Sequence, residues 1–221
     1  MIDKVLSVVA PHHCYSCGQV GTSMCDNCKY NITSEPFEGC IGCGRAAIRH
    51  GLCGSCKVPY SRAWVVDAYR GPVGEAIKGM KIVSMRETAK VLGMMLAETL
   101  PDLPTGTVLV PIPTLRSHVR QRGFDHTKMI AKSVSKHLQL PIEYPLQRVG
   151  RSMQRGSSAA QRHQQAKEAF IVEKQLDPEQ IYLLVDDVVT TGATIREASA
   201  QLRQAGAKEI WVAVLARETL D

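Results

Sequence analysis

The stretch IYLLVDDVVTTGATI, residues 181–195, decides the fold of this chain. Its first five residues form a continuous apolar run of strand length, and two acids follow directly, Asp186 and Asp187. A loop of small residues comes next, and the pattern from Thr194 to Gln204 predicts a helix that ends before Gly206. A strand that leads through such a loop into a helix is typical of a parallel sheet, which binds ligands at the carboxyl ends of its strands.

The loop after the two acids has the composition of a phosphate-binding site. Backbone N–H groups at the start of a helix favour an anion. Thr190, Thr191 and Thr194 add hydroxyl donors, and Gly192 lets the backbone approach a ligand closely. A turn with a capping threonine explains Thr194 alone, but it does not explain two acids after a buried strand. Carboxylates do not bind a phosphate, so we assign them to the hydroxyl groups of a sugar.

The chain from residue 61 onward alternates between strand and helix patterns. Short apolar runs predict strands at Ala63–Tyr69, Val108–Ile112, Ile181–Val185 and Ile210–Leu215. Apolar residues at three- and four-residue steps predict helices at Val73–Met80, Arg86–Leu100 and Phe124–Leu138. This alternation predicts an α/β fold with a parallel sheet that is covered on both faces.

All eight cysteines lie between residues 14 and 56, in four C-x-x-C pairs. The segments CYSCGQVGTSMCDNCK and CIGCGRAAIRHGLCGSCK are two copies of one unit, and four thiolates suit one tetrahedral zinc ion. The repeat favours two structural zinc ions, with the ligand sets Cys14, Cys17, Cys25, Cys28 and Cys40, Cys43, Cys53, Cys56. Spacing alone leaves a crossed pairing open, and redox dithiols or an iron–sulfur site are the less favoured alternatives.

Length and composition bound the protein class. A chain of 221 residues allows one medium domain and a small one, which we place at residues 61–221 and 1–60. No apolar run approaches the ~20 residues of a membrane helix. Val5–Ala10 is too short for a signal peptide. We therefore expect a cytoplasmic protein without membrane insertion.

Positive charge gathers between Arg116 and Lys167. Eleven Lys and Arg stand against two acids there, a balance of 11 − 2 = +9. Such a segment attracts polyanions, and a solvated helix face with a mobile loop is the plain alternative. Within it, the polar stretch from Arg148 to Gln165 is predicted to be either a lid over a charged ligand or a disordered loop.

The motif LLVDDVVTTGAT resembles the phosphoribosyl pyrophosphate (PRPP) binding motif of type I phosphoribosyltransferases. With the Cys-rich start, IKGMK at 77–81, VPIP at 110–113 and RQRGFD at 120–125, the chain resembles the ComF/GntX family over nearly its full length. The resemblance implies a type I phosphoribosyltransferase fold, a central mostly parallel sheet flanked by helices, with a small N-terminal double zinc-ribbon module.

The resemblance also implies roles for named residues. Asp186 and Asp187 are expected to contact the ribose hydroxyls, with Mg²⁺ bridging the pyrophosphate and ribose oxygens. The 5-phosphate is expected on Thr190, Thr191, Gly192, Ala193 and Thr194. The strand that presents the pyrophosphate loop is expected to end at Pro111, Ile112 and Pro113, with Arg116, Arg120 and Arg122 nearby to neutralise phosphates. The segment from Arg148 to Phe170 resembles the family's flexible hood.

Two positions depart from the family pattern. The family commonly has Asn-Gln after R-G-F, whereas Asp125 and His126 follow Phe124 here, and Gln165 stands where Asn is usual. An acid at Asp125 would repel a phosphate. His126 is a candidate general base for an acceptor amine, and a helix position without catalytic role is the plain alternative.

Two functions from different classes follow from these observations. The first is a Mg²⁺-dependent transferase that moves phosphoribose from PRPP to an acceptor that the sequence does not identify. The second is a non-catalytic protein that binds single-stranded nucleic acid or a nucleotide in the same phosphate cleft. Because ComF relatives are associated with natural competence, single-stranded DNA is a candidate partner, as is the DNA-uptake machinery through the zinc module. The scarcity of Trp and Phe disfavours strong non-specific binding to single strands.

Overall fold

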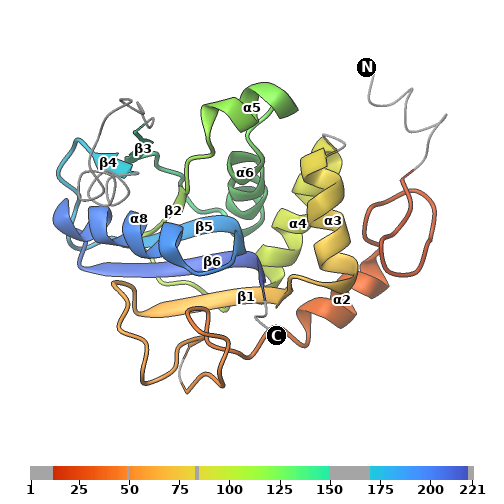
Figure 1. Ribbon diagram of the computed structural model, residues 1–221, viewed down its shortest axis with the longest axis horizontal. Coiled ribbons are helices and arrows are strands. Elements are labelled where there is room, and N and C mark those ends of the chain that lie inside the picture. The colour runs from red at the N-terminus through yellow and green to blue at the C-terminus, as the bar shows by residue number, and fades with distance from the viewer. Residues whose placement is uncertain (1–11, 49, 83–84, 150–169, 219–221) are drawn as a thin grey trace, which may run out of the picture.

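A four-stranded parallel sheet forms the centre of the protein (Figure 1). The computed structural model describes residues 12–48, 50–82, 85–149 and 170–218. The strands lie in the order β1-β6-β5-β2 and span Arg62–Ala68, Glu209–Arg217, Ile181–Val189 and Thr107–Pro111. The two central strands, β5 and β6, are buried on both faces, which is why they read as continuous apolar runs in the sequence.

Helices cover both faces of the sheet, as the alternating pattern predicts. On one face lie α3 (Gly71–Ile82), α4 (Arg86–Thr99) and α6 (His126–Leu138). On the other face lies α8 (Ala193–Gln204). Successive residues of β5 point to opposite faces, so Leu183 joins the core under the first group of helices and Leu184 joins the core under α8.

Some elements differ from their predicted bounds or lack a sequence signal. Strand β5 continues through both acids to Val189, because Asp186 pairs with Val214 of β6 and the pairing runs on to Arg217. The short helix α5 (Arg116–Arg122) has no buried residue, so no apolar periodicity marks it. The helix α2 (Asp26–Thr33) and the antiparallel strands β3 (Leu146–Arg148) and β4 (Phe170–Val172) also carry no strong pattern.

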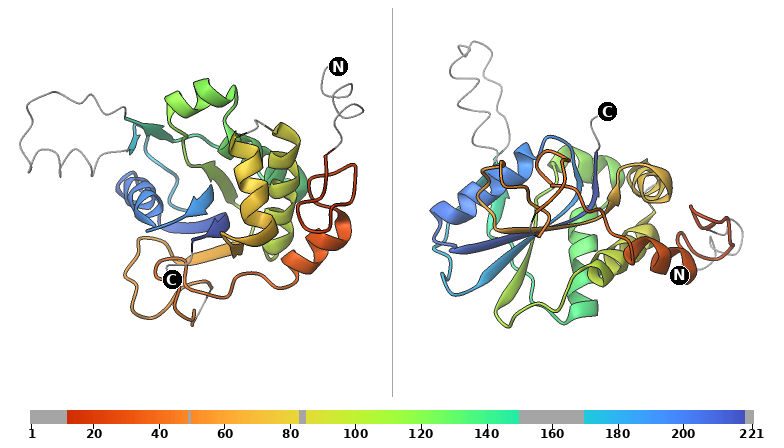
Figure 2. Two further views of the ribbon diagram at one scale, coloured as in Figure 1. Left: turned by 45° about the vertical axis from the view of Figure 1, so that its right-hand side comes forward. Right: turned by 90° about the horizontal axis from the view of Figure 1, so that it is seen from below.

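The cysteine-rich segment contributes to the hydrophobic cores on both sides of the sheet, and its first part lies beside α3 and α4 (Figure 2). Cys14 and Cys25 contribute to the core beside α3 and α4, whereas Ile41 belongs to the core on the side of α8. Farther along the segment, the backbone N–H of Ala63 in the edge strand β1 donates to the carbonyl of His50 over 2.8 Å. The segment thus covers part of an otherwise open sheet edge. The predicted domain boundary at residues 60 and 61 stays a prediction.

Two further expectations concern membrane insertion and the polar stretch from Arg148 to Gln165. Within the described ranges, no helix is long and apolar enough to cross a membrane. The segment predicted to be a lid or a disordered loop falls almost entirely on residues 150–169, which lie outside the described residues.

Candidate functional site

The two motifs that the sequence singled out meet at one edge of the sheet. Strands β2 and β5 run parallel, with Pro111 opposite Val185, and the N–H of Ile112 donates to the carbonyl of Val185 over 2.9 Å. Pro111 and Ile112 are buried, and Pro113 is partly exposed. The end of the VPIP strand therefore lies beside the end of the strand with the acidic pair. Both strand ends line the same candidate site.

Asp187 is the most strongly paired acid of the site. Its Oδ2 lies 2.8 Å from Nζ of Lys81, at the end of α3, and 2.8 Å from Nε2 of His126, at the start of α6. The N–H of Val188 donates to Oδ1 over 2.6 Å. Burial alone would raise the pKa of Asp187, but His126 and Lys81 outweigh it and hold that pKa well below its usual range. Asp187 is therefore ionised and held in place by three elements.

Asp186 has the opposite environment although it is the next residue. Its side chain is partly exposed, and its Oδ1 accepts from the N–H of Asp187 over 2.9 Å. Burial and the adjacent Asp187 carboxylate raise the pKa of Asp186, and the positive charges of Lys81 and Arg148 offset this increase only in part. Of the two acids, Asp186 is the one with a carboxylate open to a ligand, and a ligand hydroxyl or a cation would favour its ionised form.

His126 occupies one tautomer because of its two neighbours. Nη1 of Arg122 lies 3.1 Å from Nδ1 of His126, and a guanidinium group can only donate. The ring proton must therefore sit on Nε2, which lies 2.8 Å from Oδ2 of Asp187. Both ring nitrogens are engaged, so His126 as a general base stays a prediction, and that role requires one of the two hydrogen bonds to break.

The phosphate-type loop follows β5 directly and opens α8. Thr190, Thr191 and Ala193 are exposed, while Gly192 is the N-cap of α8 with φ 71°, a left-handed conformation that favours glycine. The hydroxyl of Thr191 accepts weakly from the N–H of Ala193 at 3.4 Å. The helix begins at Ala193, one residue before its predicted start. Because Thr190, Thr191 and Ala193 are exposed, the loop is accessible to an anion, and its role in ligand binding stays a prediction.

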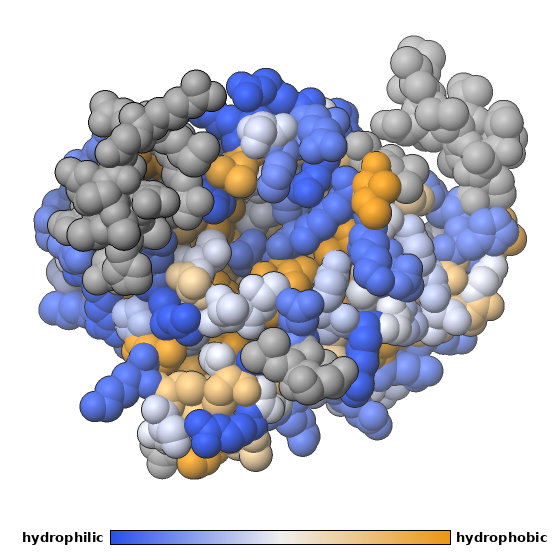
Figure 3. Space-filling view, in the orientation of Figure 1, coloured by the Kyte–Doolittle hydropathy of each residue, from blue (hydrophilic) through white to orange (hydrophobic). Residues whose placement is uncertain are grey.

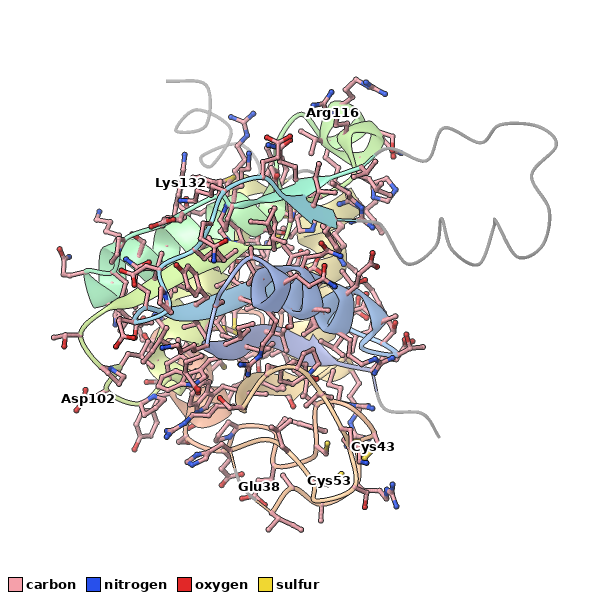
Figure 4. The ribbon with its side chains drawn as sticks, turned by 90° about the vertical axis from the view of Figure 1, so that its left-hand side faces the viewer. Glu38, Cys43, Cys53, Asp102, Arg116 and Lys132 are labelled. Carbon is pink, nitrogen blue, oxygen red and sulfur yellow. The ribbon has the colours of Figure 1, made fainter. Side chains whose placement is uncertain are left out.

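Arg116, Arg120 and Arg122, predicted as phosphate-binding residues, are not equivalent. Only Arg122 is tied to the site, through His126. Arg116 and Arg120 are exposed on α5, and in the described part of the chain neither makes a hydrogen bond or an ion pair. Hydrophilic residues dominate the surface over α5, and Arg116 projects from the end of the molecule opposite Cys43 and Cys53 (Figures 3 and 4).

Asp125 caps a helix, which accounts for an acid at this position. Its carboxylate accepts from the N–H of Lys128 over 3.2 Å at the start of α6. It also accepts from the hydroxyl of Thr114 over 3.0 Å, just after the VPIP strand. Asp125 therefore ties the loop after β2 to the helix that carries His126.

Two basic residues of the site had no assigned role at the level of sequence. Lys81 ends the motif IKGMK, but nothing in its spacing indicates that α3 reaches Asp187. Arg148 is brought in by β3, where its Nη1 donates to the carbonyl of Pro113 over 3.1 Å and its guanidinium lies over the ring of Phe170. Their chemistry could be read from the sequence, but their location depends on the packing of distant elements.

The eight cysteines form two groups, and the sequential pairing is the one the structure shows. The first cysteine cluster is Cys14, Cys17, Cys25 and Cys28, and the second cysteine cluster is Cys40, Cys43, Cys53 and Cys56. Within each cluster the sulfur atoms all lie within 4.8 Å of one another.

The chemistry of the donor set fits a metal ion. In the second cluster, the backbone and side chain of Arg45 lower the pKa of Cys43 to about 6, whereas Cys53 and Cys43 raise the pKa of Cys56 to about 12. Four thiolates this close repel one another unless a cation binds them. Both clusters are consistent with a zinc ion held by four sulfurs.

The chain is similar to several known proteins. The family model for the phosphoribosyl transferase domain matches residues 128–219. The chain is 30% identical to competence protein F of Haemophilus influenzae over 208 residues, which cover 88% of this chain and 90% of that protein. It is 31% identical to DNA utilization protein YhgH of Escherichia coli, with 80% and 83% covered, and 24% identical to competence protein ComFC of Bacillus subtilis, with 83% and 79% covered. The fold is the type I phosphoribosyltransferase fold, as predicted.

Proposed function

We propose that this chain, which belongs to the ComF family, binds PRPP at the joint carboxyl ends of β2 and β5. One observation carries the proposal. The acidic pair Asp186 and Asp187 lies near the carboxyl end of the central parallel strand β5, and the loop that begins α8 follows this strand directly. This places groups suited to a ribose and to a phosphate at neighbouring positions along one short segment.

Different residues of the site bind different parts of the ligand. Asp186 accepts hydrogen bonds from the ribose hydroxyls, since its carboxylate is partly exposed. The N–H groups and hydroxyls of the loop from Thr190 to Thr194 hold the 5-phosphate. Asp187 holds Lys81 and His126 beside the ligand. Mg²⁺ that accompanies PRPP supplies charge neutralisation at the pyrophosphate.

We extend the proposal to activity and cellular role. Transfer of phosphoribose to an acceptor, with release of pyrophosphate, is the reaction that such a site suits. The names of the relatives, competence protein F and DNA utilization protein YhgH, support a role in the uptake or use of DNA. We also propose two structural zinc ions, one in each cysteine cluster, within an N-terminal module of residues 1–60, with residues 61–221 as the phosphoribosyltransferase-like domain.

Titration calorimetry with PRPP and Mg²⁺ tests the proposed binding. We expect wild type to bind, Asp186→Asn to weaken binding by about tenfold or more, and the double variant with Asp187→Asn to abolish it, because each lost charge-assisted hydrogen bond costs about 1.5–3 kcal/mol. Asp102→Asn is the matched control, since Asp102 is exposed on the loop before β2, at the opposite edge of the sheet. Absence of PRPP binding by folded wild type would contradict the proposal.

A second function, binding of single-stranded DNA, is favoured by the exposed basic surface beside the site. Helix α5 presents Arg116 and Arg120, and Lys128 lies over the exposed ring of Tyr144. A gel-shift titration with a single strand should show binding that weakens steeply with salt, because release of counterions drives such complexes. Arg116→Ala with Arg120→Ala should weaken this binding while leaving PRPP affinity nearly unchanged. Salt-independent binding, or none, would exclude this function.

A further inference from the structure

The segment that holds the first cysteine cluster contacts α3, the helix that carries Lys81. Tyr15, between the cluster residues Cys14 and Cys17, lies on Gly79 of α3 so closely that a Cβ added at Gly79 would be 1.9 Å from the Tyr15 hydroxyl oxygen. The same hydroxyl lies 3.5 Å from the sulfur of Met85, the residue before α4. Tyr15 therefore contacts both the end of α3 and the residue before α4, and a Cβ on residue 79 would overlap its hydroxyl group.

Tyr15 is itself fixed by the fold of the cluster. Its N–H donates to the carbonyl of Ser23 over 3.0 Å, and the N–H of the preceding Cys14 donates to the carbonyl of Gln19 over 2.8 Å. Tyr15 also packs against the core that lies under α3 and α4. Its position is thus set by the turn that brings the cysteines together.

Gly79 and Lys81 face nearly opposite sides of α3. Two residues along an α-helix correspond to a rotation of about 200°. The end of α3 is therefore held between Tyr15 on the side of Gly79 and Asp187 on the side of Lys81. A shift of this helical turn toward the cysteine segment would draw Nζ of Lys81 away from the carboxylate.

We propose that the first cysteine cluster positions Lys81 in the site through the packing contact between Tyr15 and Gly79. Lys81 compensates the charge of Asp187 and keeps a cation beside the anionic ligand. The cysteine module thereby acts on ligand affinity without contacting the ligand. The effect on PRPP affinity rests on the proposed function. The contact between Tyr15 and α3 can be tested without PRPP.

A double-mutant cycle on PRPP affinity tests the coupling. We expect Lys81→Met to weaken PRPP binding by about tenfold or more and Tyr15→Ala by about three- to tenfold, as loss of a charged partner costs more than a shift in its position. In the Lys81→Met background, Tyr15→Ala should change the affinity less than about twofold. Tyr15→Phe should keep most of the affinity, and Tyr30→Ala is the matched control, because Tyr30 is an exposed tyrosine of the same segment.

Gly79→Ala changes the other side of the contact without altering the cysteine segment. It should reproduce the effect of Tyr15→Ala while the zinc content stays that of wild type. If Tyr15→Ala weakens binding by the same factor with and without Lys81, Tyr15 acts on general stability and the proposal is wrong.

Acetylation of lysines, followed by mass spectrometry, tests the same contact without PRPP. Lys81 is paired with Asp187, whereas Lys78, on the same helix, is more exposed and paired with Glu75. Tyr15→Ala and Gly79→Ala should raise the acetylation rate of Lys81 severalfold and leave that of Lys78 unchanged. An unchanged rate at Lys81 would overturn the inference even if PRPP binds. A raised rate in a protein that does not bind PRPP would uphold the contact and refute the proposed ligand.

Discussion

His126 at the start of α6 and Asp187 near the end of β5 are joined by a 2.8 Å contact between Nε2 and Oδ2. Because the Arg122 guanidinium can only donate, Nδ1 of His126 is the acceptor and the ring proton lies on Nε2, next to the carboxylate. The carboxylate receives a second donor from Lys81. One buried acid thus connects α3, α5, α6 and β5, and the stability of the site depends on its charge.

Asp187→Asn should destabilise the protein near neutral pH and have little effect in acid. The folded state lowers the pKa of Asp187, so its contribution is fully present above the unfolded pKa of about 3.9 and is lost progressively as the pH falls from there through the lower folded pKa. We expect a loss of about 1–3 kcal/mol in the free energy of unfolding near pH 7, measured by urea denaturation. A difference from wild type that stays constant down to about pH 3 would contradict this.

Asp186→Asn should have the opposite effect on stability. Burial and the charge of Asp187 raise the pKa of Asp186 to about 8. A carboxyl group with a raised folded pKa costs stability as the pH rises from its unfolded value of about 3.9 through the folded value. The variant should therefore melt a few degrees above wild type near pH 8.5 and match it near pH 4, at roughly 2–4 °C per kcal/mol. Equal melting temperatures at both pH values would refute the assigned environment.

Gly192→Ala should damage the phosphate loop more than the fold. Gly192 has φ 71°, and an added Cβ would lie 3.2 Å from Nη1 of Arg196. The strain should cost about 1 kcal/mol of stability, and PRPP affinity should fall by about tenfold as the loop N–H groups move. Gly106→Ala is the matched control, since Gly106 has φ 84° in the turn before β2. It should cost similar stability and leave affinity unchanged; an equal loss of affinity would show that strain alone is responsible.

Asp125 should behave as a helix cap and not as a phosphate ligand. Asp125→Ala removes the acceptor for the N–H of Lys128 and for the hydroxyl of Thr114, so it should lower the free energy of unfolding by about 1 kcal/mol. Asp125→Asn should cost much less, because asparagine caps helices well. Thermal denaturation of both variants checks this, and equal destabilisation by the two substitutions would argue against the cap.

The cysteine clusters should release two zinc ions per chain. A chromogenic zinc assay after unfolding should give about two equivalents for wild type and about one for Cys17→Ser or Cys53→Ser, as each closed site needs all four thiolates. Tyr30→Ala should leave the zinc content unchanged. One equivalent in wild type, or a loss of both ions from a single substitution, would contradict two independent sites.

The sequence was sufficient for the features that are local in the chain. The run Ile181–Val185, the following acids and the small-residue loop predict a strand, a turn and a helix because hydrophobic period and backbone freedom act over a few residues. The duplicated C-x-x-C pairs indicate two metal clusters for the same reason, since each ligand set is nearly contiguous. The matched family confirms the fold that these local signals predict.

Only the tertiary structure decided how the two acids differ. Asp186 and Asp187 are chemically identical neighbours, yet the ion pairs of Lys81 and His126 are formed with Asp187. Those partners come from helices placed by the packing of apolar faces on the sheet, and no local pattern encodes which charged side chain such packing brings to which carboxylate. The contact of Tyr15 with Gly79 has the same origin, because it joins a cysteine turn to a helix through shape alone. The local sequence determined which residue types form the site. Long-range packing determined which carboxylate is paired with basic side chains and which is accessible to a ligand.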